Sequence, residues 1–460
     1  MADGQVQDIE RDEEDWGLDP HAVEAILEAV EAGDSARLAE LLEDFHAADI
    51  ADLLEQVGSE ERRALLQLWS GEIDGEILSE LDEALREEVI EYLPREVLAE
   101  AVRELNSDDV VDLIEDLEGP QKDIILEALE DSDRAAVQQS LTYPEYSAGR
   151  LMQREVVTAP EHWTVGHTID FLRSEEWLPD QFYHVILVDP RHHPVAYVTL
   201  GRLLSSMRDV QLRDIVEEGF RTVRVTDEEG DVAYAFNQYH LISAPVVDEE
   251  DRLVGVITID DAMAVLDEEH EEDILRLAGV GDESLADRVL ETARLRFVWL
   301  FVNLITAILA SVVIAQFAEE IDKLVALAVL MPIVASMGGN AGTQSMTVAV
   351  RSIATRDLTV RNAWRVIRRE LAVGALNGLG FGVIMAGVAA VWFGVPMLAA
   401  VIALAMVLTL VAAALGGILI PITLDRIGVD PALASGPFVT TVTDVVGFFA
   451  FLGLASVVLL

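Results

Sequence analysis

Asp444 is the residue whose type and surroundings point most directly to chemistry. It lies inside the apolar stretch 436–460, and no other ionisable residue occurs between Asp430 and the end of the chain. A carboxylate at membrane depth costs about 3 kcal/mol, so it should face a bundle interior or a water-filled path rather than lipid. The other apolar stretches contain no lysine, arginine or histidine that could pair with it. Asp444 is therefore predicted to line an ion path; a protonated or paired structural aspartate is the alternative.

Polar side chains near Asp444 and in a second apolar stretch could belong to the same path. Thr440 lies four residues before Asp444 and hence on the same helical face, although threonines in helices also bond to their own backbone. In "SMGGNAGTQ" (336–344), Asn340 and Gln344 share a face. Glycine-rich backbone at membrane depth is tolerated where it is buried in protein or lines a cavity. The segment is thus either a tight helix contact or a wall of the path, and Asn340 favours the path.

Asn377 is a further polar residue within an apolar stretch. Gly374, Gly378 and Gly382 recur around it every four residues. This spacing is typical of helix packing in membranes. Helix packing and ion contact both remain open for this segment.

Five apolar stretches supply the elements that must position these residues. They cover 297–317, 324–350, 371–393, 397–424 and 436–460, and each is close to or above the ~20 residues that span a hydrocarbon core. The connection 351–370 carries six arginines, whereas the first loop reads "AEEIDK". By the positive-inside rule the region before the spans is cytoplasmic, and five spans place the C-terminus outside. The sequence predicts a multi-pass protein of the cell (plasma) membrane, in contact with lipid.

The formal net charge of −52 belongs to the predicted cytoplasmic region. From residue 297 onward, eight acidic side chains balance eight basic ones, so the excess lies in residues 1–296. So many carboxylates with only two lysines resemble halophilic proteins, in which salt screens the repulsion. Such a surface repels nucleic acid and could collect divalent cations. The absence of cysteine excludes disulfides and Cys-ligated metal sites.

Two predicted regions precede the spans. Residues 20–142 read as short amphipathic helices with acidic caps, which predicts a helical superhelix, and residues 1–19 are predicted to be disordered. Residues 156–213 and 214–271 are two copies of one sequence repeat. Thr199 and Thr258 are 59 residues apart, and Asp189 and Asp248 are separated by the same distance in the sequence. Each copy has two short β-branched runs, an Asp-rich turn between them and a helix after them. The pair resembles tandem CBS motifs.

The resemblance to CBS motifs implies a nucleotide ligand such as ATP. CBS pairs often hold the ribose with a threonine and an aspartate three residues later. Thr258 and Asp261 keep this pattern, whereas Thr199 is followed by Arg202. At most one nucleotide site is therefore expected.

An acidic cluster lies between the second CBS copy and the first span. Five carboxylates share one predicted helix: Glu268, Glu269, Glu271, Glu272 and Asp273. Carboxylates at this spacing repel one another unless a cation bridges them. Hydration by salt is the alternative explanation.

The order of these parts resembles the MgtE family of magnesium channels over nearly the whole chain, and "PIVASMGGNAGTQ", "DPALASGPF" and "TTVTDVVG" carry the resemblance most specifically. The expected fold is multidomain. It comprises an α-helical superhelix (20–142), an α/β CBS-pair domain (143–264), an acidic plug helix (265–296) and an all-α transmembrane bundle of five helices (297–460).

The resemblance also implies a mechanism. It predicts a homodimer with a pore on the two-fold axis, where Asp444 selects hydrated Mg²⁺, and closure of the pore when cytosolic Mg²⁺ binds between the helical domain, the CBS pair and the plug. The matching carboxylates are Glu76, Asp108, Asp112, Asp261, Glu269, Glu272 and Asp273. Ala264 and His240 stand where the family often has acidic ligands, so the regulatory set is expected to be smaller or displaced.

The expected function is Mg²⁺ uptake through a passive channel that cytosolic Mg²⁺ closes. Two alternatives remain: a coupled carrier of divalent cations such as Mn²⁺ or Co²⁺, and a CBS-regulated membrane enzyme. No inverted repeat supports the carrier. No His, Cys, Lys or second acid lies deep in the spans beside Asp444, so catalysis is not expected.

Overall fold

The computed structural model describes residues 18–69, 73–115, 117, 119–175, 177–179, 181–280, 289–359 and 361–459. Most of the predicted disordered segment 1–19 lies outside these residues, as does the 281–288 part of the predicted plug segment 265–296. The chain divides into two compact units, Met1–Glu268 and Glu269–Leu460, and each is described by itself.

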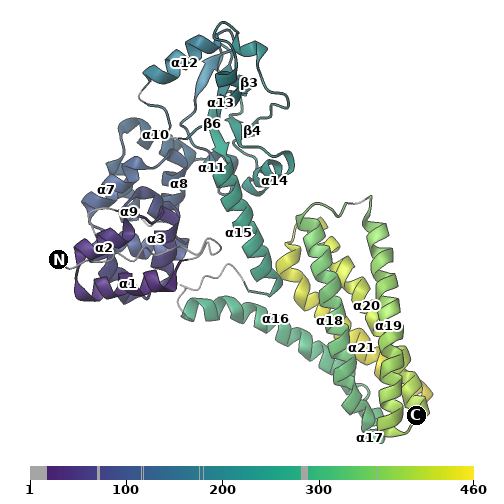
Figure 1. Cartoon of the computed structure of the whole chain (residues 1–460). Helices are drawn as coiled ribbons and strands as arrows, with labels where there is room; N and C mark the ends of the chain where they lie inside the picture. Colours follow the sequence, from purple (N-terminus) through teal and green to yellow (C-terminus); the bar gives the residue numbers. More distant parts are fainter. Residues whose placement is uncertain are drawn as a thin grey trace, which may run out of the picture. The chain divides into compact units, whose positions relative to one another are not determined.

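Short helices form the first part of the first unit (Figure 1). They are α1 (Pro20–Ala32), α2 (Ser35–Leu42), α3 (Ala47–Gln56), α4 (Ser59–Leu68), α5 (Gly75–Ser79), α6 (Glu83–Tyr92), α7 (Arg95–Glu104), α8 (Ser107–Glu115), α9 (Gly119–Ala128) and α10 (Asp131–Ser140).

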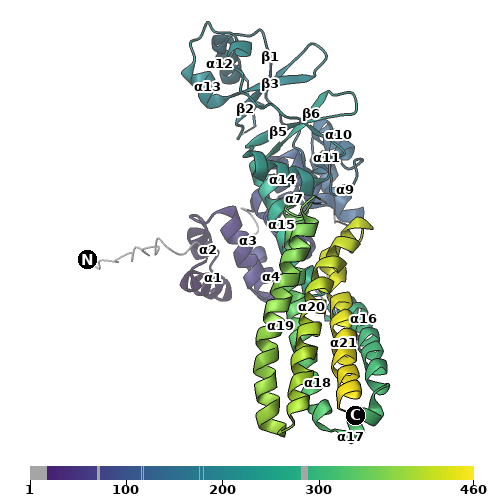
Figure 2. The ribbon, with the colours of Figure 1, turned by 90° about the vertical axis from the view of Figure 1, so that its right-hand side faces the viewer.

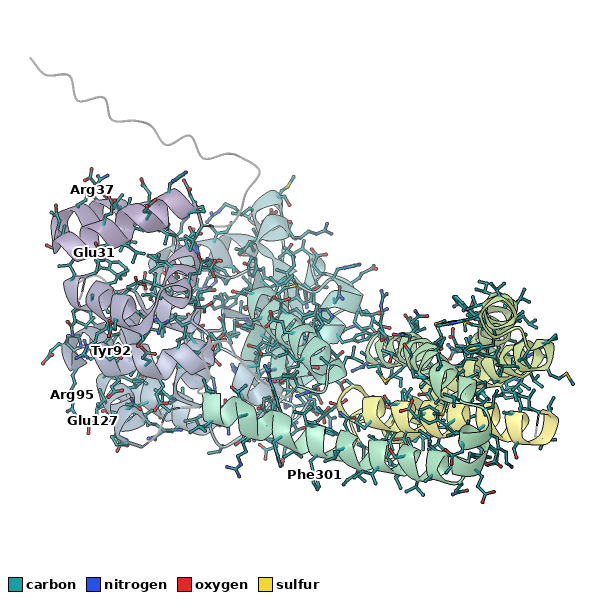
Figure 3. The ribbon with its side chains drawn as sticks, turned by 90° about the horizontal axis from the view of Figure 1, so that it is seen from below. Glu31, Arg37, Tyr92, Arg95, Glu127 and Phe301 are labelled. Atoms are coloured by element: carbon teal, nitrogen blue, oxygen red, sulfur yellow. The ribbon has the colours of Figure 1, made fainter. Side chains whose placement is uncertain are left out.

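The acidic caps predicted for these helices are present. Asp19 and Asp34 accept backbone N–H groups at the starts of α1 and α2, which satisfies donors that the helix itself leaves free. The apolar faces meet in one core that runs from Ile26 to Val137. Charged side chains such as Glu31 and Glu127 project outward (Figure 3). The amphipathic pattern therefore gives a stacked helical domain with a solvated acidic surface.

Two three-stranded sheets form the rest of the first unit, with strand orders β1-β2-β3 and β4-β5-β6. The short α11 (Ala148–Leu151) precedes them. The first copy comprises β1 (Thr158–Pro160), α12 (Val165–Ser174), β2 (His184–Val188), β3 (Pro194–Thr199) and α13 (Leu200–Ser205), followed by the 3₁₀ turn η1 (Leu212–Asp214). The second comprises β4 (Val223–Arg224), α14 (Glu229–Tyr239), β5 (Ser243–Val247), β6 (Leu253–Thr258) and the long α15 (Ile259–Leu277).

The strand register confirms the repeat. His184 pairs with Thr199 in the first sheet, and Ser243 pairs with Thr258 in the second, each partner lying 59 residues further on. Asp189 and Asp248 make the same turn, each accepting two backbone N–H groups from the residues that follow. The two copies thus share backbone geometry as well as sequence.

Five helices of the second unit are long and apolar enough to cross a membrane: the Thr292–Ala315 part of α16 (Val289–Ala315), α18 (Ala326–Ala354), α19 (Ala363–Phe393), α20 (Pro396–Arg426) and α21 (Pro431–Val458). The short α17 (Ala318–Lys323) joins the first two. Figure 2 shows the long helices side by side. Helix α19 begins eight residues before the predicted span, because the arginine-rich connection continues it.

Helix α20 is the most buried of these five, and α18, α19 and α21 all pack against it. Helix α16 contacts α21 and is mostly exposed, and Phe301 projects from its outer side (Figure 3). Helix α18 stays unbroken through Pro332 and the glycine-rich segment 336–344. The helix-breaking residues of that segment therefore do not produce an irregular backbone.

Candidate functional site

Asp444 lies in the middle of α21 and is half-buried. Its carboxylate makes no hydrogen bond or ion pair with any other residue in the described ranges. The preceding residue, Thr443, is fully buried and donates its hydroxyl to the carbonyl of Thr440 at 2.9 Å. A carboxylate without a partner in the chain is stable at this depth only beside water or an ion.

Thr440 is exposed one turn before Asp444. Its Oγ1 donates to the carbonyl of Gly436 at 2.9 Å, so the back-bonding that is common for threonine is present. The hydroxyl oxygen still has lone pairs to offer to a water molecule or a hydrated cation. Thr440 and Asp444 therefore give α21 one polar face.

Helix α18 presents polar side chains on one exposed face: Ser336, Asn340, Thr343, Gln344 and Thr347. The Asn340 amide nitrogen lies 3.5 Å from Ser336 Oγ, and Thr343 bonds back to the carbonyl of Gly339. Exposed polar groups on a membrane helix are costly against lipid. This face suits a water-filled path, as predicted for Asn340.

The opposite face of α18 carries the close helix contacts. A Cβ on Gly342 would lie 2.8 Å from Val439 Cγ1 and 3.0 Å from Thr443 Cγ2 on α21. A Cβ on Gly338 would lie 2.7 Å from Thr409 Cγ2 on α20. The tight helix contact expected for the segment is thus present on its buried face, whereas the ion path stays a prediction. The contact with Thr443 brings α18 next to Asp444.

The glycines of α19 serve packing. A Cβ on Gly374, Gly378 or Gly382 would lie 2.8 Å from α20. The α20 atom at this distance is a backbone atom or a Cβ in each case. Asn377 points to an exposed side. The four-residue spacing is therefore explained by the α19–α20 contact.

A cluster of carboxylates joins α8 to the start of α15 in the first unit. Burial, followed by the charge of Asp261, raises the pKa of Asp109 to about 7 and raises the pKa of Asp108 well above its ordinary value. Burial also raises the pKa of Asp261 to about 6, and the charge of Asp260 adds to this. Asp108 and Asp261 were predicted from the sequence. Asp109 was not, although it follows Asp108 in the same helical turn.

Two predicted ligands stand apart from this cluster in their contacts. Asp112 on α8 is half-exposed and pairs with the buried Arg86, Nη1 to Oδ2, at 2.8 Å. Glu76 on α5 is exposed and lines a cavity of about 730 Å³ in the helical domain, together with Asp74, Glu40 and residues of α3. The structure thus gives Asp112 a resident counter-charge and gives Glu76 different neighbours.

The last two turns of α15 meet the membrane bundle within the second unit. Arg276 pairs with Glu272 at 2.8 Å and with Asp430, the N-cap of α21, at 3.6 Å. Burial, followed by the charge of Asp430, raises the pKa of Asp273. Leu277 packs against buried residues of α18 and α21. Sequence reasoning missed Asp430, whose signal is its place immediately before Pro431 at the start of the last span.

The carboxylates do not form a ready-made metal site. Within the described ranges, no three histidine, aspartate or glutamate side chains have the geometry to hold a metal ion. Glu269 is exposed on α15. Ala264 is exposed on the same helix, and His240 ends α14 in a left-handed conformation with φ 54°. Neither of these two positions supplies a carboxylate.

The cleft between the CBS copies is small. Thr258 Oγ1 donates to Asp261 Oδ2 at 2.6 Å, so the two residues predicted to hold the ribose are in contact with each other. His184 and Ser243 are 2.5 Å apart across the cleft, whose volume of about 20 Å³ has room for about one water molecule. In the first copy Thr199 faces Glu217, at 3.2 Å. A nucleotide would therefore require these side chains to move.

Comparison with known proteins places each part in order. The family model named MgtE, a divalent cation transporter, matches residues 331–454. The model of the MgtE intracellular N domain matches residues 45–146. The model of the CBS domain matches residues 212–268, which are mainly the second copy. The magnesium transporter MgtE of Thermus thermophilus is 34% identical over 446 residues, covering 95% of this chain and 98% of that protein. The MgtE of Enterococcus faecalis is 33% identical over 320 residues, covering 70% of this chain and 71% of that protein.

A solved structure, the cytosolic domain of the Mg²⁺ channel MgtE in complex with ATP, is 28% identical and covers 53% of this chain and 99% of its own, with a TM-score of 0.49. The relative from Thermus thermophilus spans nearly the whole chain, from the helical domain through the five apolar helices. The chain therefore belongs to the MgtE family of magnesium transporters.

Proposed function

We propose that this protein is a Mg²⁺-selective channel whose path runs between the polar face of α18 and Asp444 of α21. The observation that supports it is the unpaired Asp444 carboxylate on a helix that packs against α18 through Gly342 and Thr443. Mg²⁺ gives up its waters reluctantly, so carboxylate, hydroxyl and amide oxygens would contact its hydration shell. Asp444, Thr440 and Asn340 offer these three oxygen types.

Transport through this path is passive uptake in our proposal. A membrane potential of 100 mV, negative inside, favours uptake of a divalent cation by about 4.6 kcal/mol. The N domain is intracellular, and five spans then place the C-terminus outside. Membership of a family of non-enzymatic transporters removes the membrane enzyme considered above.

The functional unit in this proposal is a homodimer. Two copies of Asp444 facing each other across a two-fold axis would double the negative charge that a single chain can place in the path. Helix α16 and the polar face of α18 are both exposed in one chain, which leaves surface for a second copy. Lipid covers the remaining apolar surface.

Cytosolic Mg²⁺ closes the channel in our proposal by binding to the acidic groups. The raised pKa values of Asp108, Asp109 and Asp261 reflect buried negative charge, which a divalent cation would neutralise. Glu76, Asp112, Glu269, Glu272 and Asp273 are the other carboxylates offered, with Asp430 added by the structure. Bound Mg²⁺ would supply positive charge between surfaces that otherwise repel.

A nucleotide such as ATP is the second regulatory ligand in this proposal. The Thr258–Asp261 pair would meet the ribose after the cleft opens. ATP titrated against the intact protein and against Thr258→Ala tests this, because saturable binding that the substitution leaves unchanged would contradict the assignment.

The test of the main proposal is Mg²⁺ flux into sealed proteoliposomes under an imposed potential. Asp444→Asn keeps the size and removes the charge, and is expected to reduce flux at least tenfold. Asp425→Asn, an exposed acid at the end of α20, is the matched control. Unchanged Mg²⁺ flux in Asp444→Asn would contradict the assignment of Asp444 to the pore. Flux that saturates and requires a second ion gradient would instead indicate the coupled carrier.

A further inference from the structure

Glu370 is a buried carboxylate of the membrane unit that the ion path described above does not use. It lies on α19, is 8% exposed, and accepts a hydrogen bond from Ser345 Oγ of α18 at 3.0 Å. Ser345 is 6% exposed. Among the residues that the structure describes, no basic side chain pairs with Glu370. Burying a carboxylate is costly, and one hydroxyl donor offsets only part of that cost.

The neighbouring helix leaves room for this bond. Helix α19 packs on α20 at Gly374, one turn after Glu370, where a Cβ would meet Ala414 and the carbonyl of Leu410. Helix α20 packs on α18 at Gly417, where a Cβ would lie 2.8 Å from Ser345 Cβ. The absence of a side chain at Gly417 therefore lets α18 approach α20 closely, beside the direct bond between Ser345 and Glu370.

The same stretch of α18 sets the spacing to the pore helix. Gly342, one turn before Ser345, packs on Thr443, and a Cβ there would lie 3.0 Å from Thr443 Cγ2. Asp444 follows Thr443, and Asn340 lies on the opposite, exposed face of α18. A change in the position of α18 along or away from α21 would thus alter the distance between the Asn340 face and the Asp444 carboxylate.

We propose that Glu370 is a positioning residue for cation selection: its hydrogen bond to Ser345 fixes α18 against α20 and α21 and so sets the width of the path at Asp444. This inference rests on the proposed pore. Buried polar groups often add little net stability, because replacing them by well-packed apolar groups can be neutral. Their directional bonds can still select one packing of helices, and the size and rigidity of a site are among the properties that distinguish Mg²⁺, which keeps its waters, from Ca²⁺, which sheds them more readily.

The test measures the ratio of Ca²⁺ to Mg²⁺ flux in proteoliposomes for the full-length protein. Glu370→Leu and Ser345→Ala each remove the bond and are expected to raise the ratio at least about threefold, and the double variant should match the single ones, because contacting residues are not additive. Glu370→Gln keeps an acceptor for Ser345 and should restore the wild-type ratio. The matched controls are Asp357→Asn, at an exposed position, and Ser352→Ala, at a half-buried serine whose hydroxyl bonds within its own helix, to the carbonyl of Val348.

Three outcomes overturn the inference. The first is an unchanged ratio in Ser345→Ala, which removes a single hydroxyl and so remains informative even where Glu370→Leu fails to fold. The second is a ratio in Glu370→Gln as altered as in Glu370→Leu, since charge and not the bond would then act. The third is additive effects in the double variant. The pore proposal fails separately, through unchanged Mg²⁺ flux in Asp444→Asn.

Discussion

Arg276 near the end of α15 forms an ion pair with Asp430, the residue whose carboxylate caps α21, at 3.6 Å. The same guanidinium holds Glu272 at 2.8 Å. Arg276 therefore places a positive charge between two acidic groups and links α15 to the start of the helix that carries Asp444. Leu277 adds an apolar contact beside it.

Removing the Arg276 charge is expected to loosen this link. In Arg276→Gln, the carboxylates of Glu272, Asp273 and Asp430 would face one another without the guanidinium, so repulsion would favour separation of α15 from α21. We expect a higher residual Mg²⁺ influx than wild type when the cytosolic side already contains enough Mg²⁺ to close the channel. Arg294→Gln, an exposed arginine of α16, is the control. An equal residual influx in Arg276→Gln and wild type would show that the ion pair does not hold the closed arrangement.

The proposed closure by Mg²⁺ has a direct readout in the segment 264–296, which links the CBS pair to the first span. Protection of this segment from protease should increase as Mg²⁺ is titrated into the intact protein, because bound cations relieve repulsion between acidic surfaces. High NaCl serves as the control, since it screens charge without specific coordination. Protection that NaCl reproduces at equal ionic strength would argue for screening alone.

The carboxylate cluster on α8 and α15 predicts an unusual pH dependence. The pKa values of Asp109 (about 7) and Asp261 (about 6) in the folded chain exceed the ordinary value of 3.8. The folded state therefore binds more protons than the unfolded state between about pH 4 and 7, and stability must fall as pH rises through this window. The loss should level off above about pH 8, where both carboxyl groups are ionised in the folded and in the unfolded chain.

Hydrogen exchange of the α8 amides, corrected for the intrinsic rate, measures this change in the full-length protein. Protection should decrease from pH 5 to pH 7.5 in the absence of divalent cations, and Mg²⁺ should restore it at pH 7.5. Asp109→Asn should flatten the dependence, whereas Asp123→Asn on α9 should not. Protection that rises with pH would contradict the raised pKa values.

The sequence allowed the elements to be predicted and singled out Asp444 as the unusual residue of the last helix. Asp444 stood out because charge is rare at membrane depth, and the 59-residue repeat matched the strand register because both depend on local pattern. The contacts of Asp112 with Arg86 and of Glu370 with Ser345 were not predictable. Each joins separate helices, and neither partner carries a local signal of the other.

The glycine-rich segment of α18 shows the same limit. The glycines and the proline indicated a helix contact or a path, but their helix-breaking tendency suggested an irregular backbone. Contacts with α20 and α21 override that tendency, and the helix continues from Ala326 to Ala354. The sequence could indicate a close approach or a path, whereas the face of α18 that makes the close approach could be identified only from the positions of the neighbouring helices.

The α19–α20 contact predicts a sharp difference between neighbouring glycines. In Gly378→Ala the new Cβ would lie 2.8 Å from Val407 Cα, a backbone atom that can move only with its helix, and we expect a loss of about 1–3 kcal/mol. Gly380→Ala on the same helix meets nothing within 4 Å and should be neutral or slightly stabilising. Thermal unfolding in detergent compares the two, and equal effects would argue against the contact.

Gly342 gives the corresponding test at the path itself. A Cβ at this position would lie 2.8 Å from Val439 Cγ1 and 3.0 Å from Thr443 Cγ2, so Gly342→Ala should push α18 away from α21 beside Asp444. We expect altered Mg²⁺ flux with a stability loss of about 1–3 kcal/mol. Gly339→Ala, three residues earlier on α18, meets nothing within 4 Å and serves as the matched control. Flux that changes equally in both variants would show that helix propensity, and not the approach of α18 to Thr443, is responsible.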